Sequence, residues 1–174
     1  MTDSHLSDLR FDTLDLHDSL RKGIADAGFE CATPIQADTL PIALQGKDVA
    51  GQAQTGTCKT GAFLVTFISR LLSEKREDDG LPAALIMAPT RELSHQIVEE
   101  AQALARHSKL RILEVVGGVD YQRQDKALKT GVDIVIGTPG RLIDYYIQRI
   151  FKTDKIKLMV IDDAVRLHDL GGVK

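Results

Sequence analysis

A loop of small residues, AQTGTCKT at positions 53–60, has the composition of a phosphate-binding loop. In such loops, backbone N–H groups and a helix amino end surround phosphate oxygens. Lys59 would then meet the β- and γ-phosphates, and the Thr60 hydroxyl would bind Mg²⁺. The other phosphate contacts would come from Thr55, Gly56, Thr57 and Cys58. The strict pattern G-x-x-x-x-G-K-[ST] fails at both glycines, because Ala53 and Cys58 occupy them.

An acidic pair, Asp162 and Asp163, ends the apolar run KLMVID and could complete a nucleotide site. A strand-terminal aspartate holds the water shell of the metal in nucleotide-binding sheets, so Asp162 would share Mg²⁺ with Thr60. Taken alone, the loop equally fits a turn that caps an amphipathic helix. The acids alone equally fit a solvated pair that closes a strand. Together, the loop and the acids favour a nucleotide site.

The elements that must position these residues follow a strand and helix alternation. Continuous apolar runs are typical of strands covered on both faces, and they occur at 48–53, 83–88, 111–116, 133–138 and 157–162. This alternation predicts an α/β fold with one parallel sheet, right-handed crossovers and helices on both faces. Ligands of such sheets bind at the carboxyl ends of the strands.

Helical patterns occur both before and between these runs. Thr33 and Pro34 predict a helix start, and Pro41 is expected to divide that helix. Wide apolar faces predict further helices over 62–72 and 93–105.

Length and composition suit one soluble domain. A chain of 174 residues can bury a core, and its net charge of −3 argues against nucleic-acid binding through a broad basic field. The two cysteines, Cys31 and Cys58, have no metal-ligand or disulfide spacing. The acidic start is unlike a signal peptide, and no apolar run approaches the roughly 20 residues that span a bilayer. We expect a cytoplasmic protein without a membrane segment.

In order along the chain, the motifs resemble those of the DEAD-box family of ATP-dependent RNA helicases, specifically the amino-terminal RecA-like domain of the bacterial type. The segment GFECATPIQ resembles the Q motif of that family, and Phe11 lies 17 residues before Gly28, where the family has an isolated aromatic residue. The other matching segments are APTREL (88–93), GG (117–118), TPGR (138–141) and VIDDAVRL (160–167). The resemblance extends from about Phe11 to Gly171.

The resemblance implies an ATP site with defined roles. The amide of Gln36 would read the adenine edge, Phe11 would stack on the base, and Phe29 and Thr33 would shape the pocket. As bare residues, the last two are better explained as a core Phe and a helix cap. Lys59, Asp162 and Asp163 would be catalytic, the last by positioning and deprotonating the attacking water.

The resemblance also implies an RNA surface that contacts the sugar-phosphate backbone, independently of base sequence. Its residues would be Pro89, Thr90, Arg91, Gly117, Gly118, Thr138, Pro139, Gly140 and Arg141. Taken singly, the arginines fit solvated side chains, and the paired glycines fit a turn.

Three residues depart from the family pattern. Cys58 replaces a glycine, which predicts weaker nucleotide binding. Asp163 replaces the catalytic glutamate, which predicts slow hydrolysis because the carboxylate is one methylene shorter. Val165 replaces the last aspartate of the motif that names the family, which removes a bond that helps couple ATP to RNA.

The expected organisation is a single RecA-like P-loop domain over 1–174, with a Q-motif region (1–46) and a P-loop core (47–174). It would be incomplete at the carboxyl end and lack the second RecA-like domain, so unwinding by this chain alone is not expected. The alternatives are a catalytically dead module that binds RNA or an unidentified protein, a different P-loop enzyme such as a small-molecule kinase, and a non-functional fragment.

Overall fold

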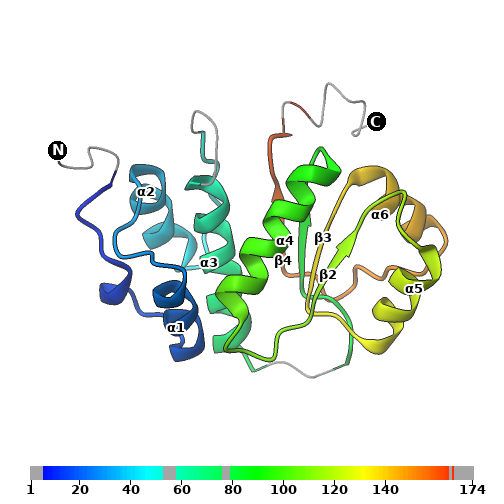
Figure 1. Ribbon diagram of the computed structural model, residues 1–174, viewed down its shortest axis with the longest axis horizontal. Helices are drawn as coiled ribbons and strands as arrows, with labels where there is room; N and C mark the ends of the chain where they lie inside the picture. The colour runs from blue at the N-terminus through cyan, green and yellow to red at the C-terminus, as the bar shows by residue number, and fades with distance from the viewer. Residues whose placement is uncertain (1–5, 53–57, 76–78, 165, 167–174) are drawn as a thin grey trace. The chain divides into compact units, whose positions relative to one another are not determined.

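The computed structural model describes residues 6–52, 58–75, 79–164 and 166. The chain divides into two compact units (Figure 1). The first comprises Met1–Arg76 and Glu100–Lys109, and the second comprises Glu77–Glu99 and Leu110–Lys174. The single domain expected over the whole chain stays a prediction.

The first unit is helical. Its elements are η1 (Phe11–Thr13), α1 (Asp18–Asp26), α2 (Pro34–Ala43), α3 (Cys58–Ser73) and the end of α4 (Arg91–Ala105). Buried aliphatic side chains from these helices form its core, among them Leu20, Leu40, Leu64, Ile68 and Leu104. The apolar faces predicted over 62–72 and 93–105 are therefore confirmed as parts of α3 and α4.

Two expectations for the first unit are wrong. Helix α2 runs through Pro41 and ends at Ala43, because the exposed proline lies only two residues before the helix end, where few backbone bonds are at stake. The predicted strand at 48–53 does not form over residues 48–52, the part of it that the structure describes, where the chain has no regular element. Val49 is 41% exposed, and the neighbouring Ala50 and Gly51 are poor strand formers.

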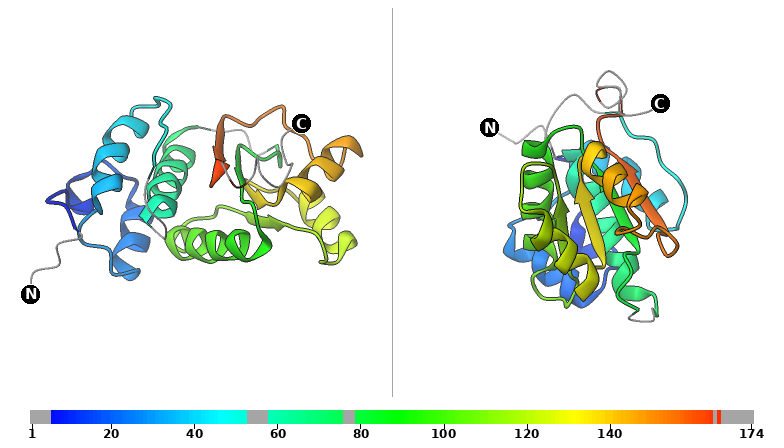
Figure 2. Two further views of the ribbon diagram at one scale, coloured as in Figure 1. Left: turned by 90° about the horizontal axis from the view of Figure 1, so that it is seen from above. Right: turned by 90° about the vertical axis from the view of Figure 1, so that its right-hand side faces the viewer.

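The second unit contains the parallel sheet. Its strands are β1 (Ala84–Met87), β2 (Ile112–Val115), β3 (Ile134–Gly137) and β4 (Leu158–Ile161), in the order β2-β3-β1-β4. The other four apolar runs are thus confirmed as strands. Helices α5 (Tyr121–Thr130) and α6 (Pro139–Ile147) lie beside this sheet (Figure 2). A core of Leu85, Val115, Val135, Leu142, Tyr145 and Phe151 joins α6 to the sheet, and Tyr121 and Leu128 of α5 pack against this core.

The register of the sheet aligns the strand ends. Met87 of β1 is paired with both Gly137 of β3 and Ile161 of β4, and Gly137 is also paired with Val115 of β2. All four strands therefore end in one row. Whatever follows each strand must begin at the same edge of the sheet.

Among the residues that the structure describes, no helix has the length and apolar content needed to cross a bilayer.

Helices α1 and α4 approach closely at Gly23, and a methyl group there should be destabilising. A Cβ on Gly23 would lie 2.0 Å from the backbone oxygen of Leu104. We expect Gly23→Ala to lower the free energy of unfolding by about 1–3 kcal/mol, the usual range for overpacking, in urea titrations followed by circular dichroism. The control is Gly140→Ala, since a Cβ on Gly140 has no neighbour within 4 Å. Equal stability of Gly23→Ala and the unmodified chain would contradict this packing.

Glu100 of α4 makes stability depend on pH. Burial raises the pKa of its carboxyl to about 7, so the folded chain binds this proton more tightly than the unfolded chain does. The stabilising contribution is full at acid pH and is lost as the pH rises through about 7. Glu100→Gln should therefore have the same melting temperature as the unmodified chain at about pH 4, below the ordinary carboxyl pKa of 4.5, and a higher one at about pH 8. The exposed neighbour Glu99, changed to Gln, is the control, and an equal gain at both pH values would refute the assignment to Glu100.

Candidate functional site

Of the predicted phosphate site, the structure describes the first turn of α3. Lys59 is half-buried there, and Thr60 is 7% exposed. Thr55, Gly56 and Thr57 lie outside the described residues, as does the side chain of Cys58. Their phosphate contacts therefore stay predictions.

Gln36 is held between two helices of the first unit. Its side chain is 7% exposed, and its Oε1 accepts a hydrogen bond of 2.9 Å from the backbone N–H of Thr33. Its Nε2 lies 2.7 Å from the position of a Cβ built on Gly61, and Glu100 Oε1 lies 3.4 Å from that position. The glutamine thus caps α2 and also packs against α3, whose second residue is Lys59.

Thr33 fulfils only part of the capping role that its sequence position suggests. It precedes α2 in an extended conformation, but its Oγ1 is buried and lacks a hydrogen-bond partner among the described atoms. The structure thus leaves a buried hydroxyl beside the expected adenine-reading amide.

Phe11 and Phe29 lie together although they are far apart in sequence. Their ring centroids are 6.3 Å apart and the rings are tilted by 34°. The backbone N–H of Phe11 donates to Glu30 O, and Arg10 forms a β-bridge with Cys31, so the isolated aromatic residue sits beside the Q-motif segment. Phe11 is 4% exposed and Phe29 is 41% exposed.

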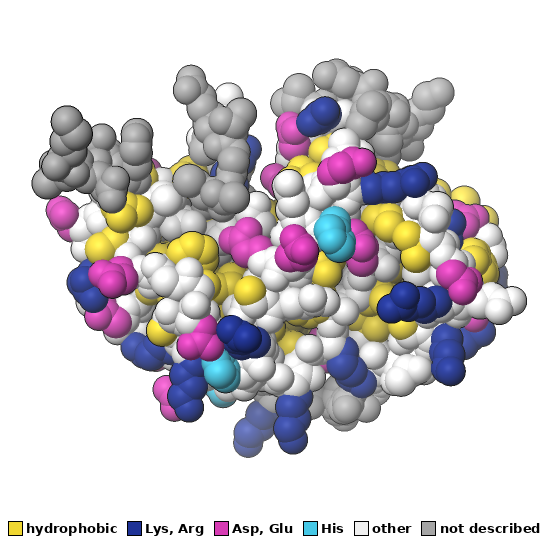
Figure 3. Space-filling view, viewed as in Figure 1, with side chains coloured by type: hydrophobic (Ala, Val, Ile, Leu, Met, Phe, Trp, Pro, Cys, Tyr) yellow, Lys and Arg dark blue, Asp and Glu magenta, His cyan; other side chains and the backbone are white. Residues whose placement is uncertain are grey.

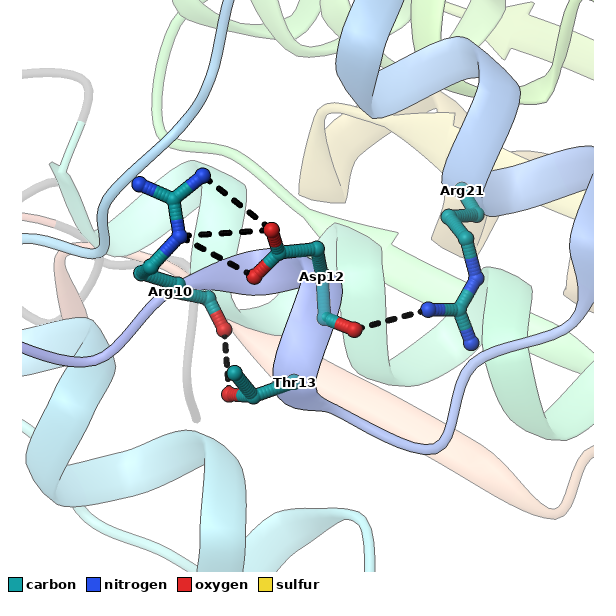
Figure 4. A network of polar contacts seen from close by, with 4 residues as sticks. All are labelled: Arg10, Asp12, Thr13 and Arg21. Atoms are coloured by element: carbon teal, nitrogen blue, oxygen red, sulfur yellow. Dashed lines mark hydrogen bonds and ion pairs between the residues drawn. The ribbon is translucent and has the colours of Figure 1, made fainter.

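A polar network holds the short turn that carries Phe11 (Figure 4). Arg10 Nη2 pairs with Asp12 Oδ2 at 3.1 Å, and Arg21 Nη1 donates to Asp12 O at 2.8 Å. The hydroxyl of Thr13 donates to Arg10 O at 2.7 Å. Hydrogen bonds from Arg10 lower the pKa of the Asp12 carboxyl, which stays ionised. The network therefore positions the Phe11 ring through its neighbours.

In the second unit, Arg91 lies against the paired glycines. It opens α4 just after β1, and the glycines follow β2. A Cβ on Gly118 would lie 2.5 Å from Arg91 Nη1, and a Cβ on Gly117 would lie 3.4 Å from Nη2. Gly118 also has a φ of +79°, a left-handed conformation that favours glycine. The guanidinium thus occupies space that any other residue at 118 would fill.

Two threonines precede helix amino ends at the same edge of the sheet. Thr90 Oγ1 accepts from Leu93 N–H at 3.2 Å at the start of α4. Thr138 immediately precedes α6, with Pro139 as the first helical residue, and its backbone N–H donates to Val115 O. Pro89 is buried, whereas Gly140 is exposed. Helix amino ends of this kind present N–H groups to anions.

Arg141 lies in the first turn of α6, beside two aromatic rings that contact each other. Its guanidinium carbon is 5.5 Å from the ring centroid of Tyr121 and 5.2 Å from that of Tyr145. Sequence reasoning did not identify these tyrosines. Their only sequence signals are that Tyr145 lies one helical turn after the arginine and that Tyr121 shortly follows the paired glycines.

The acidic pair follows β4. The backbone N–H of Asp162 donates to Met87 O at 2.9 Å, so this residue continues the line of the sheet. Asp163 is exposed and has a φ of 50°, a left-handed conformation that aspartate tolerates better than most residues. Val165 lies outside the described residues.

Charged side chains of both signs are interspersed over the face seen in Figure 3. On α4, one ring nitrogen of His95 lies 3.6 Å from a carboxylate oxygen of Glu99, and the other lies 3.5 Å from a carboxylate oxygen of Glu114. Because the net charge of the chain is −3, it has no broad basic field. The positive side chains at the strand ends would therefore attract an anion only at short range.

Sequences of bacterial RNA helicases match this chain over its whole length. It is 50% identical to the ATP-dependent RNA helicase RhlB of Shewanella baltica, with 100% of this chain and 40% of the relative covered. It is also 50% identical to RhlB of Actinobacillus succinogenes, with 42% of that protein covered. The chain thus spans about two-fifths of the length of these relatives.

Solved structures have the same fold. A DEAD box protein from the hyperthermophile Methanococcus jannaschii matches with a TM-score of 0.86 and 31% identity, over 95% of this chain and 44% of that one. A hypothetical ATP-dependent RNA helicase from Sulfolobus tokodaii matches with a TM-score of 0.79 and 30% identity, over 90% of this chain and 44% of that one. The expected RecA-like fold is therefore confirmed.

The family model of the DEAD/DEAH box helicases matches residues 33–173. This segment includes the capped helix with Gln36, the four strands and every motif that follows them. The chain belongs to the DEAD/DEAH box helicase family, and it corresponds to the amino-terminal RecA-like domain.

Proposed function

We propose that this chain is the ATP- and RNA-binding part of an ATP-dependent RNA helicase and that its nucleotide turnover is slow. The observation that carries the proposal is the common row of strand ends at Met87, Val115, Gly137 and Ile161. Each RNA-facing motif and the acidic pair begin within two residues of that row.

RNA would bind along this edge through its sugar-phosphate backbone. The amino ends of α4 and α6 offer N–H groups, and Arg91 and Arg141 offer guanidinium donors. Contacts of these kinds are indifferent to base identity, so the binding would be independent of sequence. Support comes from Gly118, whose lack of a side chain leaves room for Arg91.

ATP would bind through the first unit. An amide oxygen has two lone pairs, so Gln36 Oε1 can accept from adenine while it retains its bond to Thr33 N–H. Lys59 would hold the β- and γ-phosphates. Mg²⁺ prefers oxygen donors, and the Thr60 hydroxyl would be one of them. When bound, the ion would neutralise charge on the phosphates.

Slow hydrolysis is proposed because of Asp163, which stands where the family has its catalytic glutamate. A carboxylate one methylene shorter retreats by about 1 Å, and a displacement of that size can reduce the rate roughly a hundredfold. Cys58 and Val165 would weaken nucleotide binding and its coupling to RNA.

A second candidate is an RNA-binding module without nucleotide turnover. It is favoured by the location of the departures at Cys58, Asp163 and Val165, all in the nucleotide motifs, whereas the RNA motifs match the family. Phosphate release in the presence of RNA separates the candidates. If the unmodified chain releases phosphate slowly and Asp163→Glu releases it faster, the ATP- and RNA-binding part of a helicase is supported. If neither chain releases phosphate, the RNA-binding module without nucleotide turnover is supported.

Nucleotide affinity should increase when Cys58 is changed to Gly. Removing the side chain restores close approach of phosphate to the loop. We expect Cys58→Gly to bind a fluorescent ATP analogue with Mg²⁺ about tenfold more tightly, or ~1.4 kcal/mol, in an anisotropy titration. Lys59→Ala in the same background is the control and should abolish the gain. Equally tight binding by the unmodified chain and Cys58→Gly would show that Cys58 does not damage the site.

RNA affinity should decrease when Gly118 is changed to Ala. The new methyl group would collide with the Arg91 guanidinium and displace a phosphate donor, so we expect about tenfold weaker binding of a labelled single-stranded RNA. Gly46→Ala is the matched control. Gly46 also has a positive φ, of +83°, but the nearest neighbour of a Cβ there is 3.9 Å away, on Arg70. A similar loss in both variants would point to a general effect on folding.

A further inference from the structure

Arg141 is held by a ring pair that none of the family motifs includes. The Tyr121 and Tyr145 centroids are 5.0 Å apart and the rings meet edge to face, at 88°. Arg141 lies near both rings, and its Nη1 donates to Tyr145 Oη at 3.1 Å. A guanidinium near aromatic rings is attracted by their π-electrons and is also fixed in direction by such a bond.

The ring pair is itself anchored from both sides. Tyr145 has no exposed surface and belongs to the core of the second unit, and its hydroxyl donates to Tyr121 O at 3.4 Å. The Tyr121 hydroxyl donates to Gln148 Oε1 at 2.5 Å, and Gln148 Nε2 donates to Asp144 Oδ1 at 2.7 Å. The rings are therefore rigid relative to the sheet.

The phenol of Tyr121 keeps its proton at neutral pH. Burial, followed by the charge of Asp144, raises its pKa above the ordinary value. The hydroxyl thus stays a donor to Gln148, so the anchoring does not vary over the physiological pH range.

The position of the ring pair connects two RNA motifs. Tyr121 opens α5, three residues after Gly118, and Arg141 lies in the first turn of α6, three residues after Thr138. An arginine side chain that is already held loses less conformational freedom when it binds phosphate. We propose that Tyr121 and Tyr145 are positioning residues that hold the Arg141 guanidinium in its RNA-binding direction without contacting RNA themselves. This inference rests on the proposed RNA-binding function.

Two other roles for Tyr121 make different predictions. As a ring that stacks on an RNA base, it would contribute to affinity independently of Arg141. As a purely structural residue, it would affect stability and leave RNA affinity unchanged in chains that remain folded. A double-mutant cycle with Arg141 separates these roles from positioning.

The test measures binding of fluorescein-labelled oligouridine to the 174-residue chain by anisotropy, with folding verified by circular dichroism. We expect Arg141→Gln to weaken binding about tenfold and Tyr121→Leu about fivefold. Tyr121→Phe keeps the ring and should bind nearly as the unmodified chain does. The double variant Tyr121→Leu/Arg141→Gln should bind no more weakly than Arg141→Gln alone.

Tyr146→Leu is the matched control, because Tyr146 is a 58% exposed tyrosine on the same helix, and it should leave affinity unchanged. If Tyr121→Leu does not fold, Tyr145→Phe takes its place. This variant keeps the ring and removes the hydroxyl that accepts from Arg141 Nη1 and donates to Tyr121 O. We expect it to weaken binding about twofold when Arg141 is present and to have no effect when Arg141 is changed to Gln.

The outcomes separate this inference from the proposed function. Losses that add in the double variant show that Tyr121 contacts RNA itself, and an unchanged affinity of folded Tyr121→Leu shows that it has no role in binding; both overturn the inference and leave RNA binding intact. Unchanged binding by Arg141→Gln shows that Arg141 does not contribute to RNA binding, so this result also overturns the inference. If the unmodified chain binds no oligouridine, the proposed function itself fails, and the inference fails with it.

Discussion

The hydrogen-bond register of one small parallel sheet is the constraint on which the proposed RNA surface of this chain depends. Val115, Gly137, Met87 and Ile161, the last residues of the four strands, are paired in a row. The segment after each strand therefore starts at the same edge of the sheet. A slip of one residue in any strand would bury a motif side chain or reverse its direction. The apolar runs that specify the strands therefore also specify where arginines, glycines and acids meet.

In each unit, a polar side chain packs closely against a glycine. In the first unit, Gln36 packs against Gly61, so the cap of α2 and the first turns of α3 share one contact. In the second unit, the Arg91 guanidinium lies where a side chain at Gly118 would be. Small residues at these points allow long polar side chains to be held by packing and by hydrogen bonds at the same time.

Much of the fold could be predicted from sequence, because its strands are apolar throughout and its helices have regular apolar faces. The four strands were predicted to within one residue at either end. The strand at 48–53 could not form from Ala50 and Gly51 without burial to stabilise it. Tyr121 and Tyr145 escaped sequence reasoning because they are 24 positions apart, and only the folded chain brings both to Arg141. Likewise, no local pattern places Glu100 beside Gly61.

The backbone at Asp163 connects chain conformation to the identity of the acid. Its φ of 50° lies in a region where aspartate and asparagine are enriched several-fold over other side chains. Exchanging this aspartate for the longer acid of the family therefore alters both the reach of a carboxylate and the conformational preference of the turn that carries it.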